Sequence, residues 1–374
     1  MKRRIVINAS TVKISGGLYV ALDIIEAFIK QDDLEIKIIC PDIPSFRKFC
    51  GRATVGFVPG RLFHYINRPI LDLFWLPREI NSFDPEMVLS LSNLPARTRK
   101  YQVFLHDNAF MSQLRFSGLH LTSQNILVHR LRRMIFVNRI RFIDRIVTQT
   151  ELEKSKLIVQ VKNIPEVVVQ APLLTMHLNS IRVDGTEDVR DTGLKRIACL
   201  SRYFDHKNLE ILYRAAALCA EKQLPYQFIL TIEYDQERGA RRLIKTIEEE
   251  NCGHHIINHG KVPRKRIVEF IRQVDAIILP SLLESYSLNY LEAWYLEKPI
   301  FISDRPFARE VCREAAGYFD PEDPASLITC IEKGFSDSKE LNRRIRKGKE
   351  ILQSLPSQEK AVRIFLGNFK SAAE

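Results

Sequence analysis

The feature that most constrains the fold is an alternation of short apolar runs with helical patterns, which occurs twice along the chain. In the first half, the apolar runs Arg4–Ala9 and Glu35–Cys40 flank a segment whose apolar residues recur at helical spacing. Further strands are predicted at Met87–Leu91, Tyr101–His106, Arg145–Gln149 and Pro165–Gln170. Strands that alternate with helices are typical of parallel sheets covered by helices, so this half predicts an α/β domain.

A stretch without apolar periodicity separates the two halves. We predict a linker over residues 176–194, between a first domain over 1–175 and a second over 195–355. Strands of the second half are predicted at Arg196–Leu200, Gln227–Ile232, His255–Asn258, Ala276–Leu279 and Pro299–Ser303. A C-terminal helix over 356–374 can cross back to the first domain. Two Rossmann-like, doubly wound domains in tandem are expected to face each other across a cleft that holds the ligand.

The positive charge is concentrated in the first half. Residues 1–180 hold 25 Lys and Arg against 15 Asp and Glu, whereas residues 181–374 hold 31 against 30. Segment 129–142 interleaves apolar residues with five arginines, namely Arg130, Arg132, Arg133, Arg139 and Arg141. A basic amphipathic helix of this kind can lie on an anionic membrane. The alternatives are a core-packed helix with solvated arginines and a basic protein that binds nucleic acid, although no nucleic-acid recognition motif accompanies the charge.

The cysteines and carboxylates favour a reduced compartment and no metal site. The seven cysteines are scattered without a C-x-x-C pair, which argues against a disulfide framework or a thiolate zinc site. This pattern indicates a cytoplasmic protein. No Asp-x-Asp pair occurs in the sequence, so no metal cofactor is predicted.

The most specific stretch holds two carboxylates, Glu284 and Glu292, eight positions apart across a predicted strand-to-helix turn. At about 1.5 Å of rise per helical residue they lie roughly 12 Å apart or somewhat less, which suits the two ends of a nucleotide-linked sugar. The backbone N–H groups of Tyr286, Ser287 and Leu288 would open the helix, where unsatisfied donors favour a phosphate. A carboxylate pair at this spacing is also compatible with two ordinary surface glutamates.

This stretch resembles the E-x7-E signature of retaining glycosyltransferases of family GT4, which have the GT-B fold. The matching segments are Glu284, Leu291-Glu292-Ala293, Pro299-Ile300, Ser303-Asp304, Arg309-Glu310-Val311 and Tyr318–Pro324. The resemblance covers most of the chain and is densest from 196 to 324. The sequence departs from the family pattern at Ser285 and Ser287, where glycine is common, and at Asn289, where proline is common.

The resemblance implies a role for each conspicuous motif. Arg202 and Lys207 look like the pair that neutralises the donor's leaving diphosphate in place of a metal ion. His106, at the end of a predicted strand, resembles the family's histidine that contacts the donor sugar. Gly16 and Gly17 lie between the first strand and a helix, and in the family this turn borders the acceptor and the donor phosphate.

The loop Gly260-Lys261-Val262 looks like the family's nucleobase-binding loop. The catalytic candidates are therefore His106, Glu284, Arg202 and Lys207. The donor-binding candidates are Gly16, Gly17, Gly260, Val262, Tyr286, Ser287, Leu288 and Glu292.

These observations predict a metal-independent, retaining glycosyltransferase that uses a UDP- or GDP-linked sugar. The resemblance implies a glycan acceptor, lipid-linked as in O-antigen and other surface-polysaccharide assembly, and a peripheral position on the inner face of the cytoplasmic membrane. Another GT-B chemistry, such as sugar-nucleotide epimerisation, is the alternative among enzymes. A basic nucleic-acid-binding protein is the alternative from another class.

Overall fold

Two compact units make up the chain in a computed structural model that describes residues 2–63, 67–113, 115–116, 118–173, 193–249 and 253–367. Unit 1 comprises Met1–Arg115, Gln124–Thr175 and Leu355–Glu374, and unit 2 comprises Phe116–Ser123 and Met176–Ser354. The segment Phe116–Ser123, which we predicted within the first domain, therefore belongs to unit 2. The predicted linker lies outside the described residues except for Gly193 and Leu194.

Unit 1 contains a parallel sheet whose strands run in the order β3-β2-β1-β4-β5-β6-β7. The strands are β1 (Arg3–Asn8), β2 (Leu34–Pro41), β3 (Thr54–Val58), β4 (Met87–Ser90), β5 (Tyr101–His106), β6 (Arg145–Thr148) and β7 (Glu166–Val169). Every strand predicted in this half is present. The edge strand β3 was missed, because it is largely half-exposed and Gly56 interrupts its apolar run.

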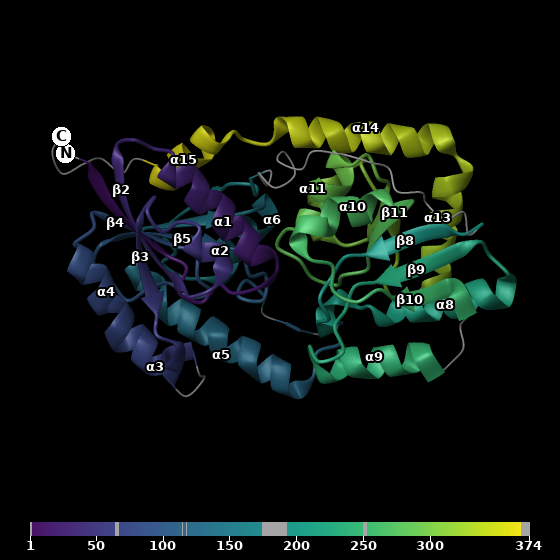
Figure 1. The fold of residues 1–374 in the computed structure, drawn as a ribbon, viewed down its shortest axis with the longest axis horizontal. Coiled ribbons are helices and arrows are strands. Elements are labelled where there is room, and N and C mark those ends of the chain that lie inside the picture. The colour runs from purple at the N-terminus through teal and green to yellow at the C-terminus, as the bar shows by residue number, and fades with distance from the viewer. Residues whose placement is uncertain are drawn as a thin grey trace. The chain divides into compact units, whose positions relative to one another are not determined.

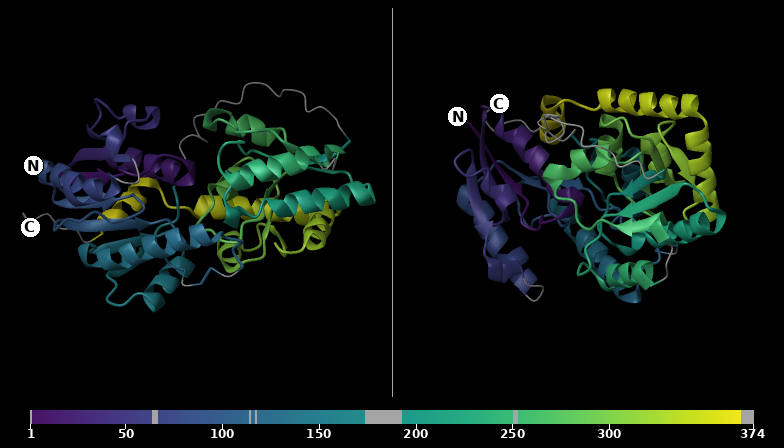
Figure 2. Two further views of the ribbon diagram at one scale, coloured as in Figure 1. Left: turned by 90° about the horizontal axis from the view of Figure 1, so that it is seen from below. Right: turned by 45° about the vertical axis from the view of Figure 1, so that its right-hand side comes forward.

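The helices of unit 1 lie on both faces of this sheet (Figure 2). They are α1 (Ser15–Ile29), α2 (Pro44–Arg47), α3 (Arg68–Ile70), α4 (Leu76–Phe83), α5 (Ser123–Arg139), α6 (Glu151–Gln160) and α15 (Gln358–Leu366), with short turns η1 (Gly60–Phe63), η3 (Leu71–Trp75) and η4 (Ile140–Phe142). The C-terminal helix α15 packs against α1, where the rings of Phe28 and Phe365 meet edge-on at 6.2 Å. The chain end therefore completes the core of unit 1.

Unit 2 has the same kind of sheet, with the parallel order β10-β9-β8-β11-β12-β13 (Figure 1). Its strands are β8 (Lys195–Cys199), β9 (Tyr226–Leu230), β10 (Ile256–Asn258), β11 (Ala276–Leu279), β12 (Ile300–Ser303) and β13 (Gly317–Phe319). Its helices and short turns are α8 (Glu210–Lys222), α9 (Arg238–Glu249), α10 (Ile267–Arg272), α11 (Leu288–Tyr295), α12 (Pro306–Cys312), α13 (Pro324–Ser336), α14 (Ser338–Ser354), η5 (Asp205–Lys207), η6 (Gly253–His255) and η7 (Arg264–Arg266).

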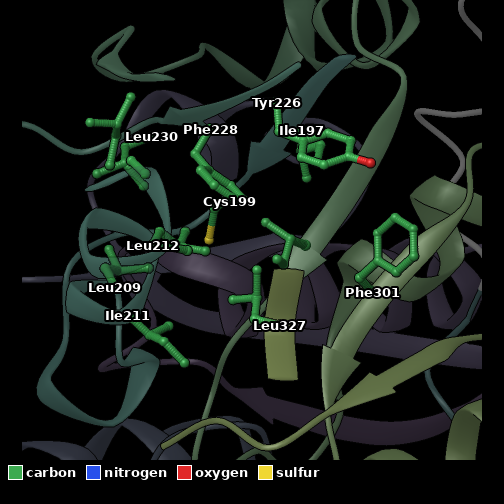
Figure 3. Close-up of a cluster of buried hydrophobic side chains, with 14 of the residues drawn as sticks. Ile197, Cys199, Leu209, Ile211, Leu212, Tyr226, Phe228, Leu230, Phe301 and Leu327 are labelled. Carbon is green, nitrogen blue, oxygen red and sulfur yellow. The ribbon is translucent and has the colours of Figure 1, made fainter. Parts of the chain in front are cut away.

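The core of unit 2 forms between its sheet and the helices α8 and α13. Ile197 and Cys199 on β8 belong to one buried cluster with Phe228 and Leu230 on β9 and Leu327 on α13, which Figure 3 shows. Leu212 of α8 belongs to the same cluster, and all of these side chains are nearly inaccessible to solvent. Burial of apolar surface stabilises the folded state by about 25 cal/mol per Å². Because the cluster joins β8 and β9 to the helices, it holds the ends of these strands, and the loops that follow them, in place.

The strand order identifies one switch point in each sheet. In unit 1 the chain moves outward from β1 through β2 to β3 and then restarts at β4 on the other side of β1. In unit 2 it moves from β8 to β10 and restarts at β11 beside β8. Ligands of doubly wound sheets bind outside the carboxyl ends of the strands at such points. The loops after β1, β4, β8 and β11 are therefore the places to look for a site.

Candidate functional site

The loops after β8 and β11 bring three of the predicted residues to the switch point of unit 2. Arg202 and Lys207 follow β8, and Glu284 follows β11. The Lys207 ammonium donates a hydrogen bond to Glu284 Oε1. Only 18% of the lysine side chain and 11% of the glutamate side chain are exposed, so solvent screens this ion pair little.

Hydrogen bonds around η5 explain why Lys207 contacts Glu284, which is 77 positions away in the sequence. The turn η5 ends at Asn208, whose left-handed conformation (φ 53°) is one that asparagine tolerates. The Asn208 amide is buried and donates to the carbonyl oxygens of Pro280 and Pro321, at 3.3 and 2.7 Å. The Leu282 N–H donates to the His206 carbonyl at 2.8 Å. These bonds fasten η5 to the loop that carries Glu284.

Glu233 connects Arg202 with the loop after β10. Its carboxylate lies 3.5 Å from an Arg202 guanidinium nitrogen and 3.3 Å from Lys261 Nζ. The Asn258 side-chain oxygen accepts from the N–H groups of Ile232 and Gly260, which links the loops after β9 and β10. Gly260 has φ +78°, a conformation that a larger residue would adopt only with strain. This geometry requires glycine at the first position of the predicted nucleobase-binding loop.

Glu292 lies on α11 with only 2% of its side chain exposed. Its Oε1 accepts a hydrogen bond from Arg264, the first residue of η7, while its Oε2 is buried and has no hydrogen-bond partner among the described residues. Burial raises the pKa of Glu292 above its usual range, and the charge of Arg264 opposes this rise. The carboxylate predicted to hold a ribose thus has one oxygen bonded to an arginine and one buried oxygen without a hydrogen-bond partner among the described residues.

The start of α11 carries backbone N–H groups, and their role at a phosphate stays a prediction. Ser287 is the N-cap residue in extended conformation, and its hydroxyl makes no capping hydrogen bond. The helix begins at Leu288, so its first N–H groups have no side-chain acceptor at the cap. The Asn289 amide donates to the Leu200 carbonyl at 2.6 Å and ties this turn to the end of β8. Tyr286 packs against Tyr290, with ring centroids 5.9 Å apart.

The predicted glycines of unit 1 lie within a helix rather than before it. We expected Gly16 and Gly17 in the turn between strand and helix, but α1 already begins at Ser15, so both belong to its first turn. A Cβ on Gly17 would lie 3.2 Å from Asp107 Oδ2, which is tighter than most such contacts. Burial raises the pKa of Asp107 to about 6, although part of the residue remains exposed. Glycine therefore allows a carboxyl group to approach the start of α1.

His106 ends β5, as predicted, but its side chain is fully buried in unit 1. The ring stacks on Phe136 with centroids 5.6 Å apart, and its Nε2 lies 3.6 Å from Glu153 Oε2. Burial raises the pKa of Glu153, but His106, Lys156 and Ser112 outweigh this effect and leave it below its usual range. In this structure the imidazole makes no contact with solvent. The sugar contact stays a prediction that requires the ring to become exposed when a donor binds.

Helix α6 begins with one of the two hydrogen bonds of a capping box. The Thr150 hydroxyl accepts from the Glu153 N–H at 3.3 Å. The reciprocal bond of a capping box is absent from the interactions described for Glu153, whose carboxylate instead accepts from Ser112 and Lys156. Glu153 therefore serves the interior of unit 1 near His106.

The basic segment 129–142 forms most of α5 and the turn η4. Leu127, Leu131 and Met134, spaced at i, i+4 and i+7, are 68%, 50% and 54% exposed. Arg130 is exposed beside them, and the described helix contains no acidic residue. Arg139 does not lie on an exposed basic face, as we had predicted for this segment. Only 13% of its side chain is exposed, and it donates to Asp72 at 3.2 Å and to the Pro95 carbonyl. Arg139 is thus a structural residue of unit 1.

Three comparisons place these observations beside known proteins. Residues 186–351 match the family model described as glycosyl transferases group 1. The match therefore falls on unit 2. The matched segment includes the loops with Lys207, Glu284 and Glu292, and it lies within Met176–Ser354. A search of curated proteins found no match.

Solved structures are similar over nearly the whole chain. Sucrose-phosphate synthase from Thermosynechococcus elongatus is 15% identical with a TM-score of 0.73, and 97% of each chain is covered. Anabaena Alr3699/HepE in complex with UDP and glucose is 12% identical with a TM-score of 0.74, over 98% of this chain and 99% of that one. WaaG, a glycosyltransferase involved in lipopolysaccharide biosynthesis, is 12% identical with a TM-score of 0.70, over 98% and 100%. With the two parallel sheets, these matches confirm the predicted GT-B fold.

Neither a membrane-spanning helix nor a metal cluster is found in the described part of the chain. Among the described residues, none of the helices is both long and apolar enough to cross a bilayer. The same residues contain no group of three or more His, Cys, Asp or Glu side chains arranged to hold a metal ion.

The site contains residues that the sequence did not single out. Glu233 and Arg264 each pair with a predicted residue. Arg264 stands in the run Arg264-Lys265-Arg266, where the sequence does not indicate which cation turns inward.

Proposed function

We propose that this protein is a retaining glycosyltransferase that transfers a sugar from a UDP- or GDP-linked donor to a glycan acceptor. The observation that carries the proposal is the pair of cation–carboxylate contacts, Lys207–Glu284 and Arg264–Glu292, within the segment that matches the group 1 glycosyl transferase model. Lys207 and Glu284 lie after the carboxyl ends of β8 and β11, where a doubly wound domain binds its ligand, and Glu292 lies on α11, the helix that follows Glu284. The similar Alr3699/HepE structure is a complex with UDP and glucose, which supports a nucleotide-sugar donor here.

Each residue of the site has a proposed task. Glu292 Oε2 accepts hydrogen bonds from the ribose hydroxyl groups, because it is the unoccupied oxygen of a buried carboxylate. Lys207 and Arg202 bind the diphosphate, since an ammonium has three donors and Glu284 uses one of those on Lys207. Glu284 then positions the hydroxyl groups of the transferred sugar. The N–H groups at the start of α11 add donors for the phosphate oxygens.

We propose that the two cations replace a divalent metal ion in the reaction. The diphosphate gains negative charge as the bond to the sugar breaks, and fixed positive charge at that place lowers the barrier. Lys207 is largely buried, so its charge acts through a medium of lower dielectric than water. Activity that survives an excess of EDTA supports this role, and a strict need for Mg²⁺ or Mn²⁺ contradicts it.

Retention of the anomeric configuration is proposed on the resemblance, without a protein nucleophile. In this proposal an oxygen of the leaving phosphate takes the proton of the acceptor hydroxyl, while Glu284 holds the transferred sugar. Proton NMR of the first product formed distinguishes the outcomes. An anomeric coupling constant of the same type as in the donor supports retention, and the inverted type contradicts it.

The donor is found by a thermal-shift panel of UDP, GDP, ADP and their sugars. A ligand that binds only the folded state raises the unfolding temperature by mass action. We expect one base to raise it most and the matching nucleotide sugar to release nucleoside diphosphate when an acceptor is added. A panel in which no nucleotide changes the transition contradicts the proposal, and reversible conversion of the donor to an epimer without transfer favours the epimerase alternative.

We propose a lipid-linked acceptor and a peripheral position on the inner face of the cytoplasmic membrane, as in surface-polysaccharide assembly. The exposed stripe Leu127, Leu131 and Met134 beside Arg130 supports this, because apolar side chains flanked by positive charge suit an acidic bilayer surface. Replacement of the three apolar residues by serine should reduce binding to phosphatidylglycerol vesicles at least tenfold and leave turnover on a soluble acceptor unchanged. Unchanged vesicle binding, or tighter binding to duplex DNA than to vesicles, contradicts it.

A further inference from the structure

Arg264 is the basic residue that the structure ties to Glu292. It follows Pro263, which is extended (φ −59°, ψ 141°), and it opens the short turn η7 after the loop that begins at Gly260. From this position its guanidinium donates to Glu292 Oε1. The arginine side chain is 16% exposed and the glutamate side chain 2%. The loop predicted to meet the nucleobase is therefore joined to the carboxylate predicted to meet the ribose.

We propose that Arg264 is a positioning residue for the nucleotide: by bonding Oε1 it orients the Glu292 carboxylate and leaves Oε2 to accept from the ribose hydroxyl groups when the nucleotide binds. This inference rests on the proposed function and extends it to a residue that needs no contact with the ligand. The chemical class of the ligand is a nucleoside diphosphate.

The burial of Glu292 is the reason why it needs a cation. A carboxylate withdrawn from water tends to take up a proton, and burial does raise its pKa, with Arg264 opposing the rise. A protonated Glu292 would have an O–H donor in place of one acceptor. The ribose hydroxyl groups would then donate to an uncharged carboxyl group, and such hydrogen bonds are weaker than those to a carboxylate.

The missing hydrogen-bond partner of Glu292 Oε2 is evidence for a ligand group at this place. Oε2 is buried and has no hydrogen-bond partner among the described residues, and such an orphan acceptor is costly unless something fills the place. Arg264 occupies the other oxygen and so fixes which one remains free. A donor that arrives with the ligand, such as a ribose hydroxyl, satisfies it.

In the described part of the chain, Arg264 is the one charged side chain that shifts the pKa of Glu292. Helix α14 packs against α11 and carries Lys349. This lysine pairs at 2.7 Å with Glu297, which follows the end of α11, and not with Glu292. Tyr290, on the same helix as Glu292, has its own pKa raised by burial and stays neutral. Removal of Arg264 therefore leaves Glu292 without a charged partner.

The test is calorimetric titration of the full chain with UDP, GDP and ADP between pH 6 and 9. The variants are Arg264→Gln, Arg264→Lys and the control Arg266→Gln, whose exposed arginine lies on the same turn and pairs with Glu269. The ratio of each variant's Kd to that of the wild type cancels the titration of the nucleotide itself. We expect Arg264→Gln to weaken binding at least about tenfold near pH 7, as the loss of a charge-assisted hydrogen bond implies.

The pH profile separates positioning from a structural role. For Arg264→Gln, the ratio of the variant Kd to the wild-type Kd should fall toward one as the pH rises, because Glu292 loses its proton. Arg264→Lys should restore most of the affinity. Arg266→Gln should leave the Kd unchanged at every pH. Arg264→Gln in a Glu292→Gln background should show no pH dependence. If Arg264→Gln does not fold, Arg264→Met, which keeps an apolar stem, replaces it.

A ratio near one at every pH, or a loss that is independent of pH and persists in the Glu292→Gln background, overturns the inference while the proposed function stands. Failure of the wild type to bind any of the three nucleotides overturns the proposed function itself.

Discussion

The switch points of the two units have the same strand arrangement but different side chains. In unit 1, Asn8 at the end of β1 donates to the Ser90 hydroxyl on β4 at 3.2 Å, and the hydroxyl groups of Ser10 and Ser92 lie 3.3 Å apart. These groups are buried and uncharged. In unit 2, the equivalent loops carry the ion pair Lys207–Glu284, with only small parts of both side chains exposed.

This difference shows that the sheet provides a place for a ligand and the loops decide its chemistry. Small hydroxyl and amide groups can complete each other's hydrogen bonds, so the switch point of unit 1 is satisfied without a charged ligand. Fixed cations beside a helix start favour an anion with several oxygen atoms. We therefore propose that the nucleotide binds to unit 2.

The largest effect is expected for Lys207→Ala. Loss of the cation that faces the diphosphate should lower kcat/KM about 100- to 1000-fold, or roughly 2.7–4 kcal/mol. The comparison variant is Ser10→Ala at the switch point of unit 1, for which less than a tenfold loss is expected. Steady-state release of nucleoside diphosphate measures both. An equal loss in the two variants would remove the distinction between the units.

A packing change should affect the stability of unit 2 specifically. A Cβ on Gly348 of α14 would lie 2.1 Å from the buried Trp294 ring on α11, which also carries Glu292. Gly348→Val should therefore cost about 2–3 kcal/mol through overpacking. The matched control is Gly60→Ala in unit 1, where a Cβ meets nothing within 4 Å. Urea unfolding measures both variants, and similar free energies of unfolding would contradict the packing argument.

The two glutamates of unit 2 should divide the work. Glu292→Ala should weaken binding of the free nucleoside diphosphate about tenfold, because the ribose loses its acceptor. Glu284→Ala should bind that nucleotide nearly as well as the wild type and mainly slow transfer. Calorimetry and turnover on the same samples give both quantities. The same loss of nucleotide affinity in both variants would mean that the carboxylates act as one site.

The smallest effect concerns the charge near the switch point of unit 1. Asp107 has a pKa raised to about 6, so the folded chain binds more protons than the unfolded chain between about pH 4 and 6. Stability should fall as the pH rises through this window, because the buried carboxyl group is forced to ionise. Asp107→Asn should flatten this slope and add on the order of 1 kcal/mol at pH 7. Chemical denaturation at pH 4, 5, 6 and 7 compares the two proteins, and parallel curves would contradict the assignment.

The architecture followed from sequence because its signals are local. The strands at Tyr101–His106 and Ala276–Leu279 have the predicted bounds, since each is a short buried run between helical patterns. The three-residue strand β13 gives no periodicity of its own and was missed. Helix α1 begins before Gly16 because Ser15 already adopts helical conformation, which two glycines in a row would not suggest.

The contacts of the site depend on tertiary structure and could not be read from the chain. Glu284 and Glu292 were predicted to meet a ligand, but their partners Lys207 and Arg264 lie 77 and 28 positions away. Lys207 reaches Glu284 because buried Asn208 bonds to two distant carbonyl groups, a detail that no local pattern encodes. His106 has the predicted strand position, while its burial against Phe136 follows from the packing of α5.

The most direct measurement is a crystal structure of the chain with the nucleoside diphosphate that gives the largest thermal shift. We expect phosphate oxygens within hydrogen-bond distance of Lys207 and Arg202. The ribose hydroxyl groups should donate to Glu292 Oε2, while Arg264 still donates to Oε1. A nucleotide bound instead at the Asn8–Ser90 end of unit 1, or bound in unit 2 without contact to either glutamate, would contradict it.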